Sequence, residues 1–278
     1  MNIQIKKFDP TTIDPCRIVV FIGKRNTGKS VLVTDILYHL RKIPMGVVMS
    51  GTEESNEHYK SFVPDSFIYG QFEPQVVEKI ITHQQGVLKK LKPEQKEDDK
   101  DPSNSVFMLL DDCMFDNKWT RDKNMRCVFM NGRHYKIFFM LTLQYCMDLP
   151  PSLRGQIDYV FILRENIIEN KVKLYKHFFG IFPNFDAFNE VFTQCTENYE
   201  CLVLNNRSTS NKIEDVVFWY KAKVNRKFRM GSPALWEHHK RNYNKSHDEP
   251  DEPVDIKKKN AIKVNVVKTD TTGKLKKK

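Results

Sequence analysis

The sequence predicts an α/β fold built on a largely parallel central sheet. Short apolar runs alternate with helical patterns from residue 17 to about residue 220, which is the spacing of βαβ units. A glycine loop stands between the first apolar run and the first helical pattern, and two aspartates end a later run. Most runs are apolar at successive positions, as expected for strands that are covered on both faces.

The first predicted helix follows the glycine loop, where Leu32, Ile36 and Leu40 recur every four residues and Pro44 marks the end. Two late apolar runs, 200–204 and 215–220, flank a polar segment and predict an antiparallel pair, so the C-terminal edge of the sheet is β-rich. The other predicted strands are 17–22, 46–50, 66–68, 105–110, 137–143 and 159–163, and the other predicted helices are 73–91, 122–131 and 166–179.

The composition is that of a globular protein. Hydrophobic residues make up 40% of the 278 residues, which excludes a fibrous or wholly disordered chain. No apolar run approaches the roughly 20 residues that span a bilayer, and the first residues lack the apolar stretch of a secretory signal. We therefore expect a soluble intracellular protein. The six cysteines show no metal-site spacing and are expected to be reduced packing residues.

The formal net charge of +10 is concentrated at one end of the chain. Residues 256–278 hold nine lysines and one aspartate, which leaves only +2 on the other 255 residues. We expect one folded domain at 1–240 with its core at 17–220, a charged surface loop at 89–104, and a disordered lysine-rich tail at 241–278. The tail is interpreted either as a solubilising segment, as an arm for polyanions or as a nuclear-import signal.

The most specific motif matches G-x-x-x-x-G-K-[ST] and stands between a strand and a helix, as its mechanism requires. Its backbone N–H groups and the helix N-terminus bind phosphates. We expect Lys29 on the β- and γ-phosphates and the Ser30 hydroxyl on Mg²⁺, which makes ATP with Mg²⁺ the expected ligand. Asn26 stands where glycine is common, and asparagine tolerates a left-handed backbone. The predicted nucleotide-binding residues are Gly23, Lys24, Arg25, Asn26, Thr27, Gly28, Lys29 and Ser30.

Polar residues follow two further strands. The apolar residues 106–110 end in Asp111 and Asp112, which places both acids at the carboxyl edge where α/β sheets bind ligands. Asp111 is expected on the magnesium side, and Asp112 is expected to polarise the attacking water. Gln144 ends the strand 137–143 and is interpreted either as a hydrogen-bond partner of the γ-phosphate or its water, or as a strand cap.

Arginines are the remaining candidates for the reaction, because a guanidinium neutralises charge on a transferring phosphoryl group. Arg133 precedes the strand 137–143, Arg154 lies between that strand and the next, and Arg164 ends the next one. Each has the alternative interpretation of a surface ion pair. His134 is expected to be structural.

These motifs in this order resemble the genome-packaging ATPases of large nucleocytoplasmic DNA viruses, such as poxviruses and iridoviruses, within the FtsK–HerA superfamily. The resemblance spans about residues 17–165 and rests on GKRNTGKS, VFMLLDDC, NGRH and LQYCMDLPPSLRGQIDYVFILRE. It implies a RecA-like P-loop NTPase core of the ASCE type and a homo-oligomeric ring, a hexamer or a pentamer. The implied activity is translocation of double-stranded DNA into a capsid, with capsid or portal components as partners.

The resemblance also implies an arginine that acts across the subunit boundary, either Arg133 or Arg154, with Arg154 preferred. It implies a location in the host cytoplasm at the virus factory or in the virion, with the host nucleus still open. Within this interpretation, basic and aromatic residues after the second acid form a candidate loop for the DNA backbone: Lys118, Trp119, Arg121 and Lys123.

Two other functions remain open. A helicase or recombination-type DNA ATPase of the same superfamily would separate strands at a fork. A nucleotide-gated assembly scaffold would bind ATP without hydrolysing it, and the short side chain of Asp112 favours this alternative. A small-molecule kinase is disfavoured because the sequence shows no arginine-rich lid.

Overall fold

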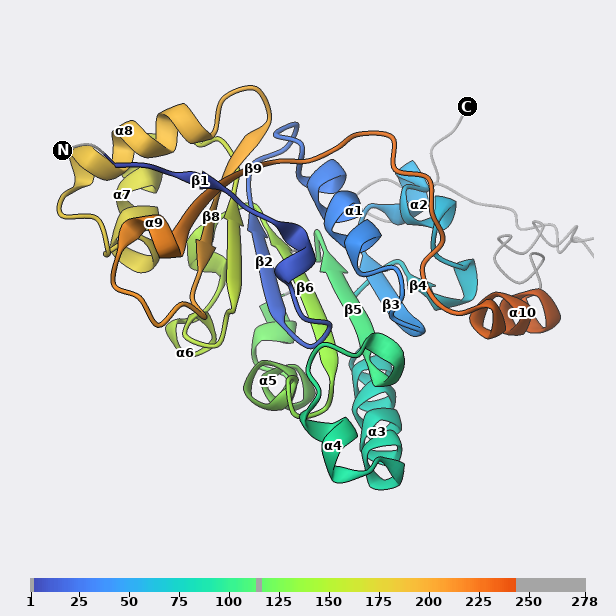
Figure 1. Cartoon of the computed structure of the whole chain (residues 1–278). Coiled ribbons are helices and arrows are strands. Elements are labelled where there is room, and N and C mark those ends of the chain that lie inside the picture. The colour runs from blue at the N-terminus through green and yellow to red at the C-terminus, as the bar shows by residue number, and fades with distance from the viewer. Residues whose placement is uncertain (1–2, 114–116, 244–278) are drawn as a thin grey trace, which may run out of the picture. The chain divides into compact units, whose positions relative to one another are not determined.

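The computed structural model describes residues 3–113 and 117–243. A nine-stranded sheet runs through this part of the chain in the order β1-β9-β8-β7-β2-β6-β5-β3-β4 (Figure 1). The six strands from β7 to β4 are parallel, β8 is antiparallel to both its neighbours, and β1 pairs in parallel with β9. The strands are β1 (Lys6–Lys7), β2 (Ile18–Ile22), β3 (Met45–Ser50), β4 (Ile68–Tyr69), β5 (Val106–Asp111), β6 (Ile137–Leu143), β7 (Tyr159–Ile162), β8 (Glu200–Asn205) and β9 (Val217–Lys221).

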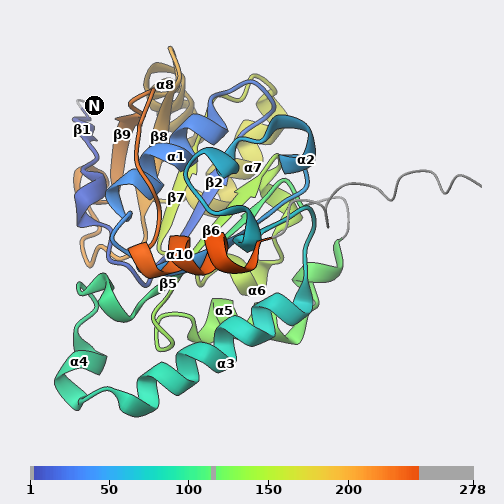
Figure 2. The ribbon, with the colours of Figure 1, turned by 90° about the vertical axis from the view of Figure 1, so that its right-hand side faces the viewer.

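Helices cover both faces of the sheet. The α-helices are α1 (Lys29–His39), α2 (Glu53–Asn56), α3 (Pro74–Lys90), α4 (Pro93–Glu97), α5 (Lys123–Asn131), α6 (Pro151–Arg154), α7 (Ile168–Phe178), α8 (Phe185–Cys195), α9 (Ile213–Val216) and α10 (Pro233–Asn242). Figure 2 shows α3 and α1 on opposite sides of the strands. Alternate residues of the central strands therefore enter two separate cores, which explains the continuous apolar runs.

The two cores divide β2 residue by residue. Val19 and Phe21 pack in the core that contains Leu32 and Ile36 of α1. Ile18, Val20 and Ile22 face the other core, to which α3, α5, α7 and α8 contribute. Burial of one such side chain stabilises the fold by about 1.5–3 kcal/mol. The sheet is thus the middle layer of three, and its strand ends are held rigidly.

The predicted α/β class, the six strands of the parallel set and the antiparallel pair β8–β9 are confirmed. Four details differ from the prediction. Of the predicted strand 66–68 only Ile68 lies in a strand, because the preceding residues form the 3-10 helix η3 (Asp65–Phe67). Helix α1 ends at His39, well before Pro44, because the Leu40 N–H already closes on the carbonyl of Leu37. Residues 215–216 belong to α9 instead of to the last strand. Strand β1, helices α8 and α10, and the short helices α2, α4, α6 and α9 were not predicted.

The charged segment after α3 is not a simple solvated loop. It contains the short helix α4, and Asp99 accepts from the buried Arg17 at 3.0 Å. Arg17 also pairs with Asp14 at 2.7 Å. These contacts hold the segment against the amino end of the sheet.

The described residues up to Asn242 form one compact unit. Helix α10 lies next to the segment that leads into β4, where the Ser66 hydroxyl is 2.7 Å from Nδ1 of His239 (Figure 2). The predicted lysine-rich tail falls outside the described residues, apart from its first three positions. Within the described ranges no helix is both long and apolar enough to cross a bilayer.

Candidate active site

The glycine loop runs from the carboxyl end of β2 into α1. Its first N–H, on Gly23, donates to the carbonyl of Leu143 at the end of β6, at 3.0 Å. Gly28 caps α1 with φ 94°, and Asn26 has φ 61°. Both values lie in the left-handed region, so the left-handed backbone expected at Asn26 is confirmed. The turn leaves the first N–H groups of α1 without intrahelical partners, which is the geometry that binds anions.

The loop lines an open cleft of about 530 Å³ together with the predicted acids. The residues around this cleft are Lys24, Arg25, Asn26, Gly28, Lys29, Ser30, Val31, Thr52, Asp111, Asp112 and Gln144. The sheet register explains why they meet: Ser50 is opposite Asp111, and Ile22 is opposite Leu143, so the ends of β2, β3, β5 and β6 share one edge. Residues more than a hundred positions apart in the sequence thus converge on one cleft.

Lys29 is folded back onto its own loop. Its Nζ donates to the carbonyl of Gly23 at 3.1 Å. Burial lowers the pKa of Lys29, the carboxylates of Asp111 and Asp112 partly offset this effect, and the positive charge of Arg25 adds to it. The ammonium therefore lies close enough to both acids for their negative charge to stabilise it, but this stabilisation does not outweigh the effect of burial.

Asp111 is held by hydroxyl groups. Thr142 donates to Oδ1 at 2.6 Å, and Tyr59 donates to Oδ2 at 2.8 Å. The Ser50 hydroxyl lies 3.5 Å from Oδ2. Tyr59 is 1% exposed, and burial, followed by the charge and hydrogen bond of Asp111, raises its pKa well above the ordinary value. The phenol is therefore a donor at any physiological pH and fixes the orientation of the carboxylate.

Glu53 in α2 positions this tyrosine. Its buried carboxylate accepts from the backbone N–H groups of Tyr59 and Lys60, both at 2.9 Å. These N–H groups begin the short 3-10 helix η2 (Tyr59–Ser61), whose first donors have no partner within the helix. Neither Tyr59 nor Glu53 was predicted, because no local pattern marks them. Thr142 could have been noticed as the single polar residue within the apolar strand β6.

Asp112, the second acid of the cleft, is paired with Gln144. The Gln144 amide donates to Oδ1 of Asp112 at 2.7 Å. Asp112 has φ 49°, and its N–H donates to the hydroxyl of Thr142 at 3.1 Å. Gly51 is required beside it, since a Cβ there would meet the Asp112 carbonyl oxygen at 2.8 Å. The left-handed turn directs Asp112 away from the path of β5 and toward Gln144.

The residues of the cleft fit a magnesium ion that is bound together with phosphates. The Ser30 hydroxyl and the Asp111 carboxylate line the same cleft and supply oxygen ligands, which Mg²⁺ prefers. Asp111 retains lone pairs beyond those used by Thr142 and Tyr59. Among the described residues no three His, Cys, Asp or Glu side chains cluster to hold a metal by themselves. Such an ion would therefore need the oxygens of a bound nucleotide.

An ion pair ties the loop to the neighbouring strand. Lys24 Nζ is 2.6 Å from Oε1 of Glu165, just after β7. Glu165 also accepts from the Ile167 N–H and the Asn170 amide, both at 2.9 Å. Burial would raise the pKa of Glu165, but these hydrogen bonds outweigh it and the pKa is lowered. The pair fixes the first turn of the loop against β7.

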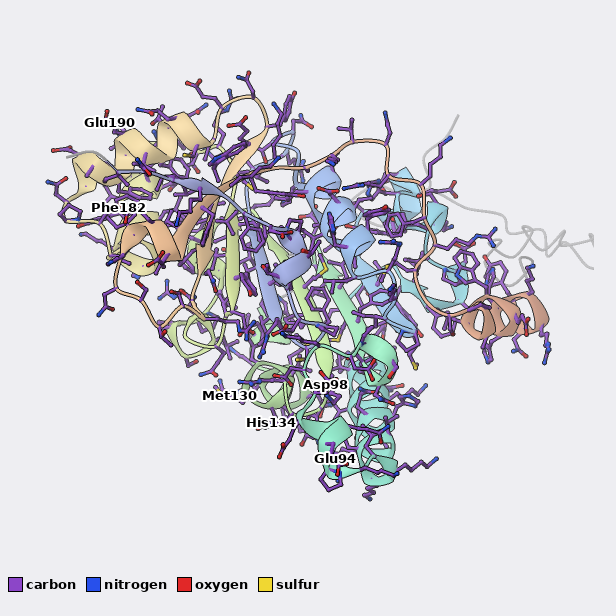
Figure 3. The ribbon with its side chains drawn as sticks, in the orientation of Figure 1. Glu94, Asp98, Met130, His134, Phe182 and Glu190 are labelled. Atoms are coloured by element: carbon purple, nitrogen blue, oxygen red, sulfur yellow. The ribbon has the colours of Figure 1, made fainter. Side chains whose placement is uncertain are left out.

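The two predicted trans arginines lie outside this cleft. Arg133 pairs with Asp99, with Nη2 at 2.9 Å, next to the start of β6. Its neighbour His134 and Asp98 are labelled in Figure 3 beside α4 and α5, at the end of the sheet opposite the glycine loop. Arg154 ends α6, and its Nη1 lies 3.4 Å from Sδ of Met147. Arg154 has no carboxylate partner within the described residues, so its guanidinium remains available to another molecule.

The predicted DNA loop needs one correction. Trp119 is 0% exposed and belongs to the core beneath α5, so its ring cannot stack on a nucleic acid. The large apolar area of an indole outweighs the basic composition of its neighbours. Arg121 and Lys123 are exposed. The side chain of Lys118 falls outside the part of the structure that is described.

No model of a known protein family matches the chain. Protein L437 of Acanthamoeba polyphaga mimivirus is 39% identical over 245 residues, which cover 87% of this chain and 84% of that protein. Protein 075L of Invertebrate iridescent virus 6 is 34% identical over 258 residues, with 88% and 96% covered.

Solved structures show the same fold. The genome packaging NTPase B204 of Sulfolobus turreted icosahedral virus 2, in complex with AMP, has a TM-score of 0.54 and 15% identity over 76% of this chain and all of that one. Its complex with ATP-gammaS gives a TM-score of 0.52 at 14% identity over the same 76%. The chain therefore belongs to the family of large-DNA-virus proteins that includes these mimivirus and iridescent virus relatives, and it has the P-loop NTPase fold of a viral genome-packaging NTPase.

Proposed function

We propose that this protein is an ATP-driven translocase that packages double-stranded viral DNA into capsids. One observation carries the proposal: Lys29, Asp111, Asp112 and Gln144 line a single cleft at the carboxyl edge of the sheet. The similarity to viral relatives and the fold shared with a genome packaging NTPase support the same function. The site of action is then the virus factory in the host cytoplasm or the virion.

Each residue of the cleft has a distinct part in ATP hydrolysis. The N–H groups of residues 23–30 and the ammonium of Lys29 bind the phosphates, and Lys29 leaves the Gly23 carbonyl to reach them. Ser30 and Asp111 hold Mg²⁺, which neutralises charge on the β- and γ-phosphates when it is bound. Asp112 accepts a proton from the attacking water, and the Gln144 amide keeps the carboxylate oriented toward it.

A ring of subunits completes the site. The cleft is open to solvent, and no arginine of α6 or of the 131–136 turn reaches it from within the chain. Arg154 of a neighbouring subunit supplies the positive charge on the transferring phosphoryl group. Arg133 is the weaker candidate, because it would first have to leave Asp99.

The DNA contacts are proposed at Lys118, Arg121 and Lys123, close in sequence to the acid pair. Lysine and arginine contacts to phosphates carry no sequence information, which suits a motor that moves along any duplex. Changing Lys118 and Arg121 to alanine is expected to lower the stimulation of ATP hydrolysis by DNA, while hydrolysis without DNA remains. Lys79→Ala, an exposed lysine of α3, is the matched control. Equal loss of both rates in the double variant would refute this placement.

Translocation on unbroken duplex DNA tests the proposed function. Displacement of a triplex-forming strand from a long blunt duplex, dependent on ATP, is the expected result. Strand separation only at a fork would indicate a helicase instead. Nucleotide binding without phosphate release would indicate the assembly scaffold.

A further inference from the structure

A second pocket adjoins the glycine loop on the side away from the acids. It measures about 190 Å³ and is lined by Asn26, Thr27, Arg164, Thr196, Asn198 and Tyr199. In the sheet order β8-β7-β2-β6-β5, the acid cluster follows β5 and β6 on one side of β2. Arg164 follows β7, and residues 196–199 precede β8, on the other side. The glycine loop therefore separates the cleft that holds Asp111 and Asp112 from a polar pocket that is lined by Arg164 and by no acidic residue.

This arrangement indicates on which side of the glycine loop each end of a bound nucleoside triphosphate lies. This orientation rests on the proposed function, in which the protein hydrolyses ATP. The γ-phosphate belongs at Asp112 and Gln144, where the attacking water is activated. The nucleoside is at the opposite end of the phosphate chain, so it must leave the loop on the side of β7 and β8. The pocket of about 190 Å³ lies on that side of the loop.

Tyr199, which lines this pocket, is both highly exposed and held in a left-handed backbone conformation. Its side chain is 70% exposed, the highest value among the exposed large hydrophobic residues of the described chain. Asn198 and Tyr199 have φ 50° and φ 63°, two successive left-handed residues. Such a conformation is uncommon for a residue other than glycine and is most unfavourable for bulky side chains, so it persists only where the surroundings impose it.

The strained turn brings the tyrosine ring onto the glycine loop. A Cβ built on Gly28 would lie 3.2 Å from Cδ1 of Tyr199, so the ring is in contact with the cap of α1. Tyr199 takes part in no ring–ring contact within the described residues. Part of the ring thus lies near the phosphate-binding backbone, while most of the residue is exposed and it lines the pocket.

We propose that Tyr199 binds the base of the nucleotide. The base stacks on the exposed ring, and the side chains of Asn198 and Arg164 contact its edge or the ribose. Aromatic rings bind every base through its π-face, so this residue adds affinity for nucleoside triphosphates over inorganic polyphosphates. The left-handed turn at 198–199 holds the ring in place before the nucleotide arrives, which limits the entropy lost on binding.

Direct binding measurements test the proposal with the full chain. Tyr199→Asn removes the ring but keeps a residue that tolerates the left-handed backbone. We expect the Kd for ATP to rise about 10-fold, within a range of about 5- to 150-fold that follows from the energy of base–aromatic stacking. The Kd for inorganic tripolyphosphate, which has no base, stays within about twofold. Tyr199→Phe restores the ring and returns the Kd for ATP to within about twofold of the wild type.

Val224→Ala is the matched control, because Val224 is 66% exposed and lines neither pocket. An unchanged Kd for ATP in Tyr199→Asn would overturn the inference and leave the proposed function intact. An equal loss of ATP and tripolyphosphate binding would also overturn it, since the ring would then only support the loop. A wild-type protein that binds neither compound would overturn the proposed function as well.

Discussion

The hydroxyl of Tyr59 donates a 2.8 Å hydrogen bond to the carboxylate of Asp111, which ends β5. Tyr59 reaches the acid from the segment after β3, where the carboxylate of Glu53 holds its backbone N–H at 2.9 Å. The position of the proposed magnesium-side acid therefore depends on a buried side chain outside every nucleotide-binding motif. This dependence can be measured.

Tyr59→Phe removes one donor from Asp111 and leaves the ring packed. A hydrogen bond to a charged group contributes about 1.5–3 kcal/mol, so we expect the free energy of unfolding to fall by about that amount. ATP hydrolysis should fall as well, because Asp111 loses one of the hydroxyl donors that orient it. Urea unfolding and phosphate release on the same preparations measure the two effects.

Tyr220→Phe is the control for this change. Tyr220 is 4% exposed, and its hydroxyl donates to Asp35 at 2.6 Å. Neither residue lines the cleft. A similar loss of stability without loss of hydrolysis is expected, and equal loss of hydrolysis in both variants would mean that Tyr59 acts only through stability.

Asp112→Asn tests the proposed proton acceptor. Asparagine has the same shape and tolerates the φ of 49° at this position, so the fold and ATP binding are preserved. Loss of the carboxylate should lower kcat about 100-fold or more, which is the usual contribution of a general base. Gln144→Ala, which removes only the orienting amide, should lower kcat by about 10-fold. Steady-state phosphate release at saturating ATP measures both, and a kcat within threefold of the wild type in Asp112→Asn would remove this residue from the mechanism.

Arg154 is expected to act on the nucleotide of a neighbouring subunit. Arg154→Ala and Lys29→Ala should each be inactive alone, since each ring then lacks one half of every site. Mixed rings place an intact cleft beside an intact arginine and should regain part of the activity. Arg133→Ala should keep most of its hydrolysis because Arg133 is engaged with Asp99. Failure of mixed, co-assembled rings to recover activity, or inactivity of Arg133→Ala alone, would argue against this choice.

The ionisation of Glu165, which pairs with Lys24 of the glycine loop, should make the stability of the protein depend on pH. Burial opposes its ionisation, but hydrogen bonds led by Lys24 lower its pKa below the ordinary value of 4.5. A carboxylate with a depressed folded-state pKa stabilises the native state above the unfolded pKa and loses this effect as the pH falls through the folded pKa. The stability difference between the wild type and Glu165→Gln should be constant above about pH 5.5 and shrink below 4.5. Unfolding curves from pH 3.5 to 7 measure it, and a difference independent of pH would contradict the assignment.

The parallel sheet could be predicted because both its faces are covered. Val19 and Phe21 enter one core while Val20 and Ile22 enter the other, and this produces the continuous apolar run. Strand β1 could not be predicted in this way, since it consists of two exposed lysines that pair with β9. Its position depends on Phe8, which packs against the rings of Phe161 and Tyr220 from distant strands.

The cleft likewise contains residues that could be predicted from the sequence and residues that could not. Residues of the glycine loop and Asp111 follow local patterns, and the structure brings them together at the expected edge. The contacts that orient Asp111 come from Tyr59 and Thr142, at separations of 52 and 31 residues, and no sequence spacing encodes them. The prediction for Trp119 was wrong because its basic neighbours in the sequence indicated an exposed loop. Tertiary packing instead buries the indole completely.

Phosphate release by size-fractionated oligomer, with and without long duplex DNA, tests the central claim most directly. The wild type should release phosphate with Mg²⁺ and ATP, and duplex DNA should raise the rate. Lys29→Ala should show no release above background under either condition, whereas Lys79→Ala on the outer side of α3 should match the wild type. If the wild type releases phosphate no faster than Lys29→Ala, the protein is not an ATP-driven motor and the cleft serves another purpose.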